Sequence, residues 1–305
     1  MTKPESSLRP LIELTFASVF WGFGFIGTIW ALHFLSFPAL LIYRFLGAFL
    51  FGSLYWLYRR PTRAQLKHEF ELSRAGGFWL AVTLVLQTWG LETTTATKSA
   101  FLTVLYVVFV PLLAALLDRE KLSVRNTLCL IGALCGTGMI VNMEWSDLAL
   151  GDFLTLANAL AAAFHIRTMG RLAPRSWDHF TFNVFQCLWT TLFILPVVGV
   201  QLVHPGAFPG GWNLVSLDFR GWFGLMSLIW GSSLLAFFLQ VRAQRKLSAT
   251  VASLLFLMES PFSAFFAAWL LGERLGLQQV LGAAVIFIAC MTASLPQKLA
   301  PGAHP

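Results

Sequence analysis

The most informative segment of the chain is Phe256-Leu-Met-Glu-Ser-Pro-Phe-Ser-Ala-Phe-Phe-Ala-Ala-Trp-Leu-Leu-Gly-Glu-Arg-Leu275. It places one carboxylate, Glu259, and one helix-disturbing proline, Pro261, inside an apolar run. An ionised side chain in hydrocarbon costs at least ~2.5 kcal/mol, so its presence there indicates a function or a specific partner. A similar stretch occurs in the first half of the chain, from Phe101 through Pro111 to Leu122. A repeated apolar helix that is broken and carries polar groups is typical of transporters.

Composition places most of this chain out of contact with water. Of its 305 residues, 57% are hydrophobic and only 11% are charged, whereas a soluble domain carries about 25% charged residues. The net charge of +7 does not indicate a nucleic-acid partner, because the basic residues lie in short clusters between apolar runs. We therefore expect an all-α integral membrane protein.

The apolar runs are long enough to predict transmembrane helices, since crossing ~30 Å of hydrocarbon takes about 20 helical residues. Cutting the chain at its charged and Pro/Gly-rich breaks predicts ten spans, with longer connections only at 59–74 and 204–218. The predicted spans are 11–33, 39–58, 75–92, 97–117, 126–142, 151–171, 179–203, 219–241, 247–271 and 277–295.

Orientation follows from the basic residues. Seventeen of the 21 Lys and Arg residues fall on the side of the termini, which predicts that both termini are cytoplasmic. The first apolar run lacks a small-residue cleavage site and is predicted to remain as a helix. Five spans in each half would make residues 1–145 and 146–305 two repeats of inverted orientation, an architecture in which two halves rock around a central site.

Several short motifs together carry a family resemblance that spans nearly the whole chain. They are Trp21-Gly22, Tyr43-Arg44-Phe45-Leu46, Ser99–Leu102, Tyr106–Leu112, Gly151-Asp152, Ala163–Ile166, Met258–Ser260, Leu271–Leu275 and Leu281–Ala284. In their order and spacing they resemble the EamA family of the drug/metabolite transporter superfamily. One departure is Asp118-Arg119, where the family's first half more often continues apolar, so the end of the fourth helix differs from the pattern.

The resemblance implies a multi-pass carrier of the inner or plasma membrane that exports amino acids or other small metabolites from a cavity between its halves. Efflux by alternating access, with coupling to protons, is the expected mechanism. A membrane channel, or a facilitator without coupling, is the alternative. The expected partners are a small-molecule substrate, membrane lipids and protons, and no nucleic acid.

Two charged residues are the main candidates for the site. Glu259 lies about 12 residues, or ~18 Å, into its predicted span, near mid-membrane. It would contact a substrate amine or take up a proton, or else be a structural acid bonded to a neighbouring helix. Arg44 lies ~9 Å below the outer end of the second span and would either extend to the headgroups or point inward. Pointing inward, it would hold a substrate carboxylate or pair with Glu259.

Polar and aromatic residues near mid-span could complete this cavity. They are Trp21, Gln87, Tyr106, Asn158 and Trp230. Taken singly, each could equally pack or bond between helices. His165 could relay protons, but its place near the cytoplasmic end of its span favours an interfacial role.

Pro111 and Pro261 occupy matching places in the two similar stretches, and each removes one helix hydrogen bond. We expect them to act as paired hinges, with tolerated kinks as the alternative.

No enzyme signature accompanies these features. The chain contains no HExxH, GxSxG or Walker sequence, and its four cysteines form no CxxC pair. The sequence therefore predicts no enzyme, no cofactor and no metal site.

Overall fold

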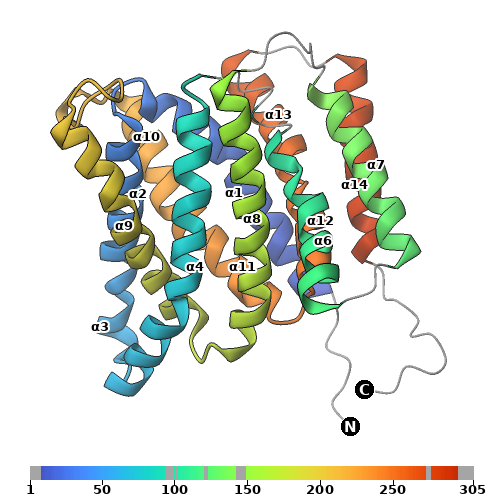
Figure 1. The fold of residues 1–305 in the computed structure, drawn as a ribbon, viewed down its shortest axis with the longest axis horizontal. Helices are drawn as coiled ribbons and strands as arrows, with labels where there is room; N and C mark the ends of the chain where they lie inside the picture. The colour runs from blue at the N-terminus through green and yellow to red at the C-terminus, as the bar shows by residue number, and fades with distance from the viewer. Residues whose placement is uncertain are drawn as a thin grey trace.

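The computed structural model describes residues 8–93, 99, 102–119, 123–141, 149–272 and 276–294. Within these ranges the regular elements are helices, packed side by side in one bundle (Figure 1). They are α1 (Leu8–Leu32), α2 (Phe37–Ser53), α3 (Tyr55–Arg59), α4 (Arg63–Gly90), α6 (Tyr106–Asp118), α7 (Val124–Val141), α8 (Leu150–Leu172), α9 (His179–Val203), α10 (Phe219–Ser227), α11 (Phe237–Gln244), α12 (Ala249–Phe256), α13 (Glu259–Leu271) and α14 (Leu277–Ser294). A π-helical segment, Leu228–Ala236, joins α10 to α11.

Five helical segments are long and apolar enough to cross a membrane. They are Leu8–Leu32, Phe37–Arg59, His179–Val203, Phe219–Gln244 and Ala249–Leu270. Two shorter apolar helices, Leu102–Leu117 and Leu277–Ala293, accompany them. The prediction of an all-helical protein with apolar spans is thereby confirmed.

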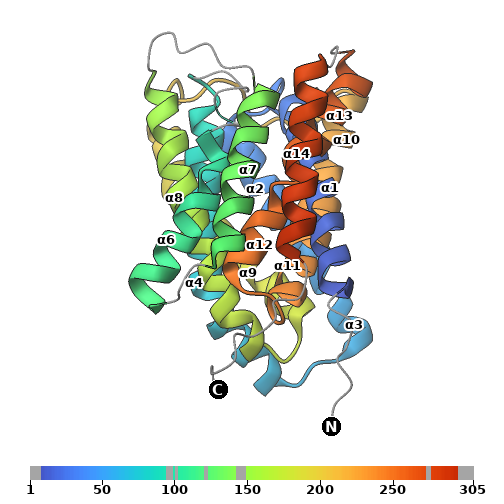
Figure 2. The ribbon, with the colours of Figure 1, turned by 90° about the vertical axis from the view of Figure 1, so that its right-hand side faces the viewer.

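The helices pack in pairs that join the two halves of the chain. α2 packs against α9, α6 against α12, and α7 against α14. The members of the first and last pairs run in opposite directions (Figures 1 and 2). The first helices of the two halves, α1 and α8, make similar contacts with the opposite half. α1 packs on α10, α11 and α13, and α8 packs on α4 and α6. The first described residue of α1 and the last of α14 lie at the same end of the bundle, which we call the terminal side.

Helix α4 corrects one predicted boundary. Residues 59–74 were expected to form a connection, but the helix already begins at Arg63. Thr62 caps it, since its hydroxyl accepts from Gln65 N at 3.2 Å while its own N–H donates to Gln65 Oε1 at 2.9 Å. The fully buried Glu69 accepts hydrogen bonds from the backbone N–H groups of Trp177 and Asp178, at 2.6 and 3.0 Å. The charged segment 63–74 is therefore helical, and α4 begins 12 residues before the predicted apolar span.

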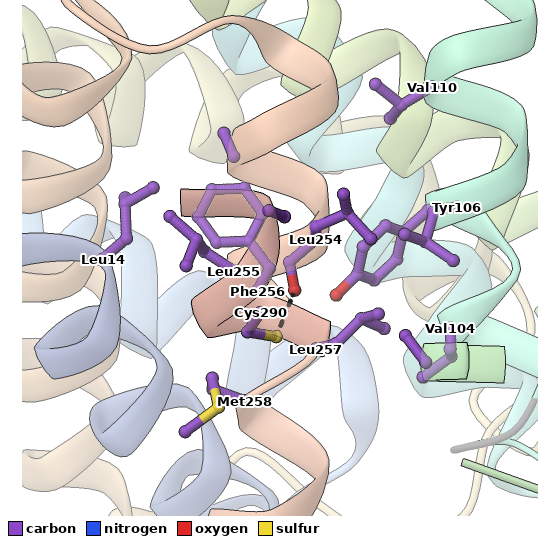
Figure 3. Packing of buried hydrophobic residues seen from close by; sticks show 14 of the residues in the cluster. Leu14, Val104, Tyr106, Val110, Leu254, Leu255, Phe256, Leu257, Met258 and Cys290 are labelled. Carbon is purple, nitrogen blue, oxygen red and sulfur yellow. Dashed lines mark hydrogen bonds between the residues drawn. The ribbon is translucent and has the colours of Figure 1, made fainter. Parts of the chain in front are cut away.

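The span predicted for 247–271 is two helices, α12 and α13, with a turn at Leu257-Met258. At this turn Leu254 O and Leu255 O accept 3₁₀-type bonds from Leu257 N at 3.2 Å and Met258 N at 3.1 Å, and each carbonyl also accepts a second bond from another helix. Leu254 O accepts from Cys290 Sγ at 2.9 Å (Figure 3), and Leu255 O accepts from Ser18 Oγ at 3.3 Å. Such bonds are what makes irregular backbone tolerable at membrane depth.

Pro261 lies in the first turn of α13, where its missing N–H costs no helical bond. The first-half counterpart breaks in the same manner. Leu105 forms a turn, α6 begins at Tyr106, and Pro111 lies within that helix. Both breaks therefore precede their prolines in sequence. They contribute to one apolar cluster that holds Tyr106 and residues 254–258 (Figure 3).

The π-helical segment is a feature that the predicted span 219–241 did not contain. Side chains of other helices bind its backbone: Trp21 Nε1 donates to Ser232 O at 3.2 Å, and Asn183 Nδ2 donates to Ser233 O and Leu234 O, each at 3.0 Å. π-Helical turns often mark functional sites.

Candidate functional site

A cavity of about 130 Å³ lies where the two chain halves meet. One water needs ~10–15 Å³ on this measure, so the space admits several waters or a small metabolite. Helices α1, α2, α4, α8 and α13 and the segment from the π-helix into α11 all contribute to its wall. Its polar and aromatic lining comprises Trp21, Phe25, Thr28, Arg44, Thr83, Gln87, Thr88, Thr103, Tyr106, Asn158, His165, Ser232, Phe237, Gln240, Phe256 and Glu259.

Arg44 points into the protein. Its side chain lines the cavity and the residue is only 7% exposed, so it does not extend to the surface. Its Nε donates to Ser233 Oγ at 2.8 Å, and its Cζ lies 5.0 Å from the ring centroid of Phe45. These contacts fix a guanidinium of α2 against the π-helical segment. A cation is therefore held at the cavity wall.

Glu259 lines the same cavity as the first residue of α13. The break at Leu257-Met258 creates this helix start, and a helix N-terminus favours negative charge. Arg44 and Glu259 are both described, and no nitrogen–oxygen pair between them lies within 4.0 Å. The two charges thus share one cavity without direct contact.

The rest of the wall combines fixed aromatic rings with an unused polar atom. The ring of Trp21 lies 5.1 Å from each of the rings of Phe237 and Phe256. Asn158 Nδ2 donates to Thr103 Oγ1 at 3.0 Å, while Asn158 Oδ1 is buried with no partner among the described residues. A buried polar atom without a protein partner calls for a water or a ligand. The wall can therefore bind a molecule that has both apolar and polar parts.

Comparison with known proteins shows the family of the chain. The EamA-like transporter family matches the chain twice, over residues 10–142 and 149–295. The chain belongs to the EamA-like transporter family. The resemblance seen in the sequence is confirmed, and with it a multi-pass membrane protein built from two repeats, of the kind found in the drug/metabolite transporter superfamily.

Other comparisons add the fold alone. One solved structure, described only as a crystal structure of a protein, is 16% identical and superposes with a TM-score of 0.76. The match covers 94% of this chain and 97% of the other. No curated protein matches the chain.

The structure of this EamA-like chain brings together six of the seven residues that the sequence nominated for the cavity. Those six are Trp21, Arg44, Gln87, Tyr106, Asn158 and Glu259. The seventh, Trp230, does not line it: the residue is 49% exposed and its ring lies 5.0 Å from that of Phe51. Trp230 lies two residues before Ser232 on a helix, and residues two apart point to different sides.

His165 and Gln240 are cavity residues that the sequence did not place there. His165 was expected at the membrane interface, but it is 4% exposed and lines the cavity. The available signal was helical spacing. Asn158, Ala162, His165 and Ile166 recur at intervals of three and four and all line the cavity. A search along that face of α8 from Asn158 would have found His165.

Two buried glutamines of α11, of which Gln240 lines the cavity, are hydrogen-bonded to each other. Gln240 Nε2 donates to Gln244 Oε1 at 2.8 Å, and Gln244 Nε2 donates to Ile166 O at 3.0 Å. Both residues are 1% exposed, so these bonds are made out of water. They tie α11 to α8. Within the described ranges, no group of three His, Cys, Asp or Glu side chains could hold a metal ion.

Proposed function

We propose that the chain is a secondary transporter of the inner or plasma membrane that exports small metabolites such as amino acids. The observation that carries the proposal is the presence of Arg44 and Glu259 in the wall of one cavity. Opposite charges that share a cavity without touching suit a zwitterion. Glu259 would bind its ammonium group and Arg44 its carboxylate, in the planar bidentate geometry that guanidinium favours. The aromatic wall around Trp21 would take an apolar side chain.

The proposed architecture is ten crossings in two inverted five-helix halves, residues 1–145 and 146–305, with both termini cytoplasmic. Its support is the antiparallel course of α2 against α9 and of α7 against α14. The boundary at 145–146 lies outside the described residues. An odd number of crossings per half inverts the second half, and inverted repeats permit alternating access around a midplane site.

Alternating access needs elements that bend. The breaks at Leu105 and at Leu257-Met258 are candidate hinges, each followed by a proline. Pro261 has no N–H to donate to Leu257 O, the bond that would continue the helix across its break, and Pro111 removes the bond to Val107 O just after the other, so both would make bending easier. The buried bonds of Gln240 and Gln244 would open when the cavity faces the terminal side. In this mechanism a hinge at each repeat moves one half past the other.

Coupling to protons is part of the proposal and rests on Glu259. Protonation would neutralise its charge and release the bound ammonium group. Transport would then follow an imposed pH gradient. A facilitator, or a channel, would carry substrate at a rate that depends on the substrate gradient alone.

The test is a counterflow screen in proteoliposomes that hold the purified protein, with amino acids and related metabolites at several pH values. Exchange of a zwitterionic amino acid, accelerated by an imposed pH gradient, is the expected result. Flux that ignores the pH gradient would overturn the coupling. Unitary conductance in planar bilayers would show a channel instead and overturn the carrier mechanism.

A further inference from the structure

A second polar cavity, of about 200 Å³, lies on the terminal side, away from the central site. It forms where α1 and α9 begin and where α11 ends. Its charged lining consists of Arg9, Glu13, His179, Arg242, Arg245 and Lys246. Four fully basic groups thus face a single carboxylate and a histidine.

The carboxylate of Glu13 is already paired with two of these basic groups. Its Oε1 accepts from Arg242 Nη2 at 2.6 Å and from Arg9 Nε at 3.0 Å, and Glu13 is only 6% exposed. The neighbouring Asp178 caps α9 and does not line the cavity. With Arg9, Arg242 and Arg245 against one carboxylate, the described residues of the cavity already carry an excess of positive charge.

Two nitrogen atoms of the lining lack any partner. Arg242 Nε and His179 Nε2 are buried and make no hydrogen bond to described residues. Buried polar atoms are nearly always bonded, so two in one cationic cavity indicate a polar ligand. The positive surroundings require that ligand to be an anion.

An apolar groove of about 540 Å³ continues from the same residues. It shares Arg9, Glu13 and Arg242 with the cationic cavity. Its other walls come from α1 and from the segment that leads into α11: Leu8, Ile12, Phe16, Phe20, Leu235 and Leu239. Ile12 is 46% exposed and Phe16 57%, so the groove opens on the outer surface of the bundle. That surface faces lipid in a membrane-spanning chain.

We propose that the cationic cavity and the groove together bind one anionic phospholipid, with its phosphate in the cavity and an acyl chain along the groove. Basic pockets beside transmembrane helices at the cytoplasmic leaflet attract anionic headgroups. A free phosphate would match the cavity but leave the groove empty, whereas a zwitterionic lipid would match the groove but not the charge. Because α1 belongs to the first half and α9 and α11 to the second, the lipid bridges the two halves. The site does not depend on what the central cavity carries.

Native mass spectrometry of the detergent-purified full chain tests the proposal, with phosphatidylglycerol and phosphatidylcholine titrated separately. Each basic residue near an anionic lipid contributes about fivefold in affinity, so Arg245→Gln with Lys246→Gln should weaken phosphatidylglycerol binding about 30-fold. Phosphatidylcholine binding should not change. The matched control, Arg59→Gln with Arg63→Gln, removes the same charge from exposed terminal-side positions that do not line the cavity, and should bind as the wild type does.

A second variant, Ile12→Trp, fills the groove without touching the cationic cavity. Ile12→Trp should weaken phosphatidylglycerol binding, and inorganic phosphate should not compete for the site more strongly than in the wild type. This variant still tests the proposal if the double variant fails to fold. Equal retention of the two lipids by the wild type would overturn the proposal. So would equal losses in the double variant and its control. Displacement of the lipid by millimolar phosphate, with Ile12→Trp unchanged, would show a soluble-anion site and overturn the lipid assignment.

Discussion

A β-carbon at Gly22 of α1 would lie only 3.0 Å from the backbone oxygen of Glu259. The same β-carbon would lie 2.8 Å from Cβ of Phe262 and 2.9 Å from the nitrogen of Ser263. Only glycine permits this approach of α1 to the start of α13, as small residues do wherever membrane helices pack closely. The position of Glu259 in the cavity is therefore set partly by a residue of the other half of the chain.

Gly22→Ala should destabilise the protein by about 1–3 kcal/mol, because α13 must move to admit the methyl group. Unfolding of the detergent-purified protein measures the change. Gly199→Ala in α9 is the control, since nothing lies within 4 Å of a β-carbon there. That control should be neutral or slightly stabilising, because alanine favours helix over glycine. Equal effects of the two substitutions would contradict the close approach.

Ser233→Ala removes the hydroxyl that accepts from Arg44 Nε at 2.8 Å. A hydrogen bond to a charged group contributes about 1.5–3 kcal/mol, so a loss of stability of that size is expected. Substrate affinity should also fall, since the guanidinium would no longer be held at the cavity wall. Ser233→Thr retains the hydroxyl and should behave closer to the wild type. Unchanged unfolding and affinity in Ser233→Ala would show that the bond does not position Arg44.

A double-mutant cycle on substrate binding tests whether the two charges pair directly. Its variants are Arg44→Gln, Glu259→Gln and the two substitutions together. Each single change should weaken equilibrium substrate binding by about 10- to 100-fold, the loss of one charged contact. No ion pair within 4.0 Å joins the two residues, but both face one cavity, so the coupling of their effects should stay at or below about 1 kcal/mol, in the lower part of the range for residues that interact. Binding measured by equilibrium dialysis gives the coupling energy. A coupling well above 1 kcal/mol would indicate direct pairing instead.

Gln244→Leu leaves Ile166 O and the Gln240 amide without their buried partner. The expected cost is about 1–3 kcal/mol of stability. If these bonds form the closed floor of the cavity, the variant should also exchange substrate faster from the terminal side. Chemical unfolding and sidedness of counterflow measure the two effects. Wild-type stability together with wild-type exchange from the terminal side would show that the glutamine bonds play no part in transport.

The elements that the sequence predicted well are those governed by local physics. Apolar length predicted helices, and the high cost of charge in hydrocarbon singled out Glu259 and Arg44, both of which line the cavity. Helical spacing alone could not tell which side of the bundle Trp230 faces, and that residue lies at the surface. The prediction that Trp230 lines the cavity was wrong because the side that its helix turns toward the cavity is set by packing against neighbouring helices.

The helix breaks and the π-helical segment depend on residues distant in sequence. Ser18 and Cys290 stabilise the carbonyls at the turn after α12, while Trp21 and Asn183 bind those of the π-helical segment. Proline indicated that a break was near, but not that it lies at Leu257-Met258. In the first turns of α4, Glu69 likewise accepts hydrogen bonds from the N–H groups of Trp177 and Asp178, which precede α9. Such partners become visible only once the chain is folded.

Counterflow by Glu259→Gln in proteoliposomes tests whether this carboxylate binds the transported substrate. The substitution keeps the size of the side chain and removes the charge. We expect exchange of a zwitterionic amino acid to fall at least about 10-fold, as loss of one charged contact requires, while the protein remains folded. Glu71→Gln, an exposed carboxylate in α4 that lies 3.9 Å from Lys67 Nζ, should transport normally. Wild-type flux through folded Glu259→Gln would show that Glu259 does not bind the ammonium group of the substrate.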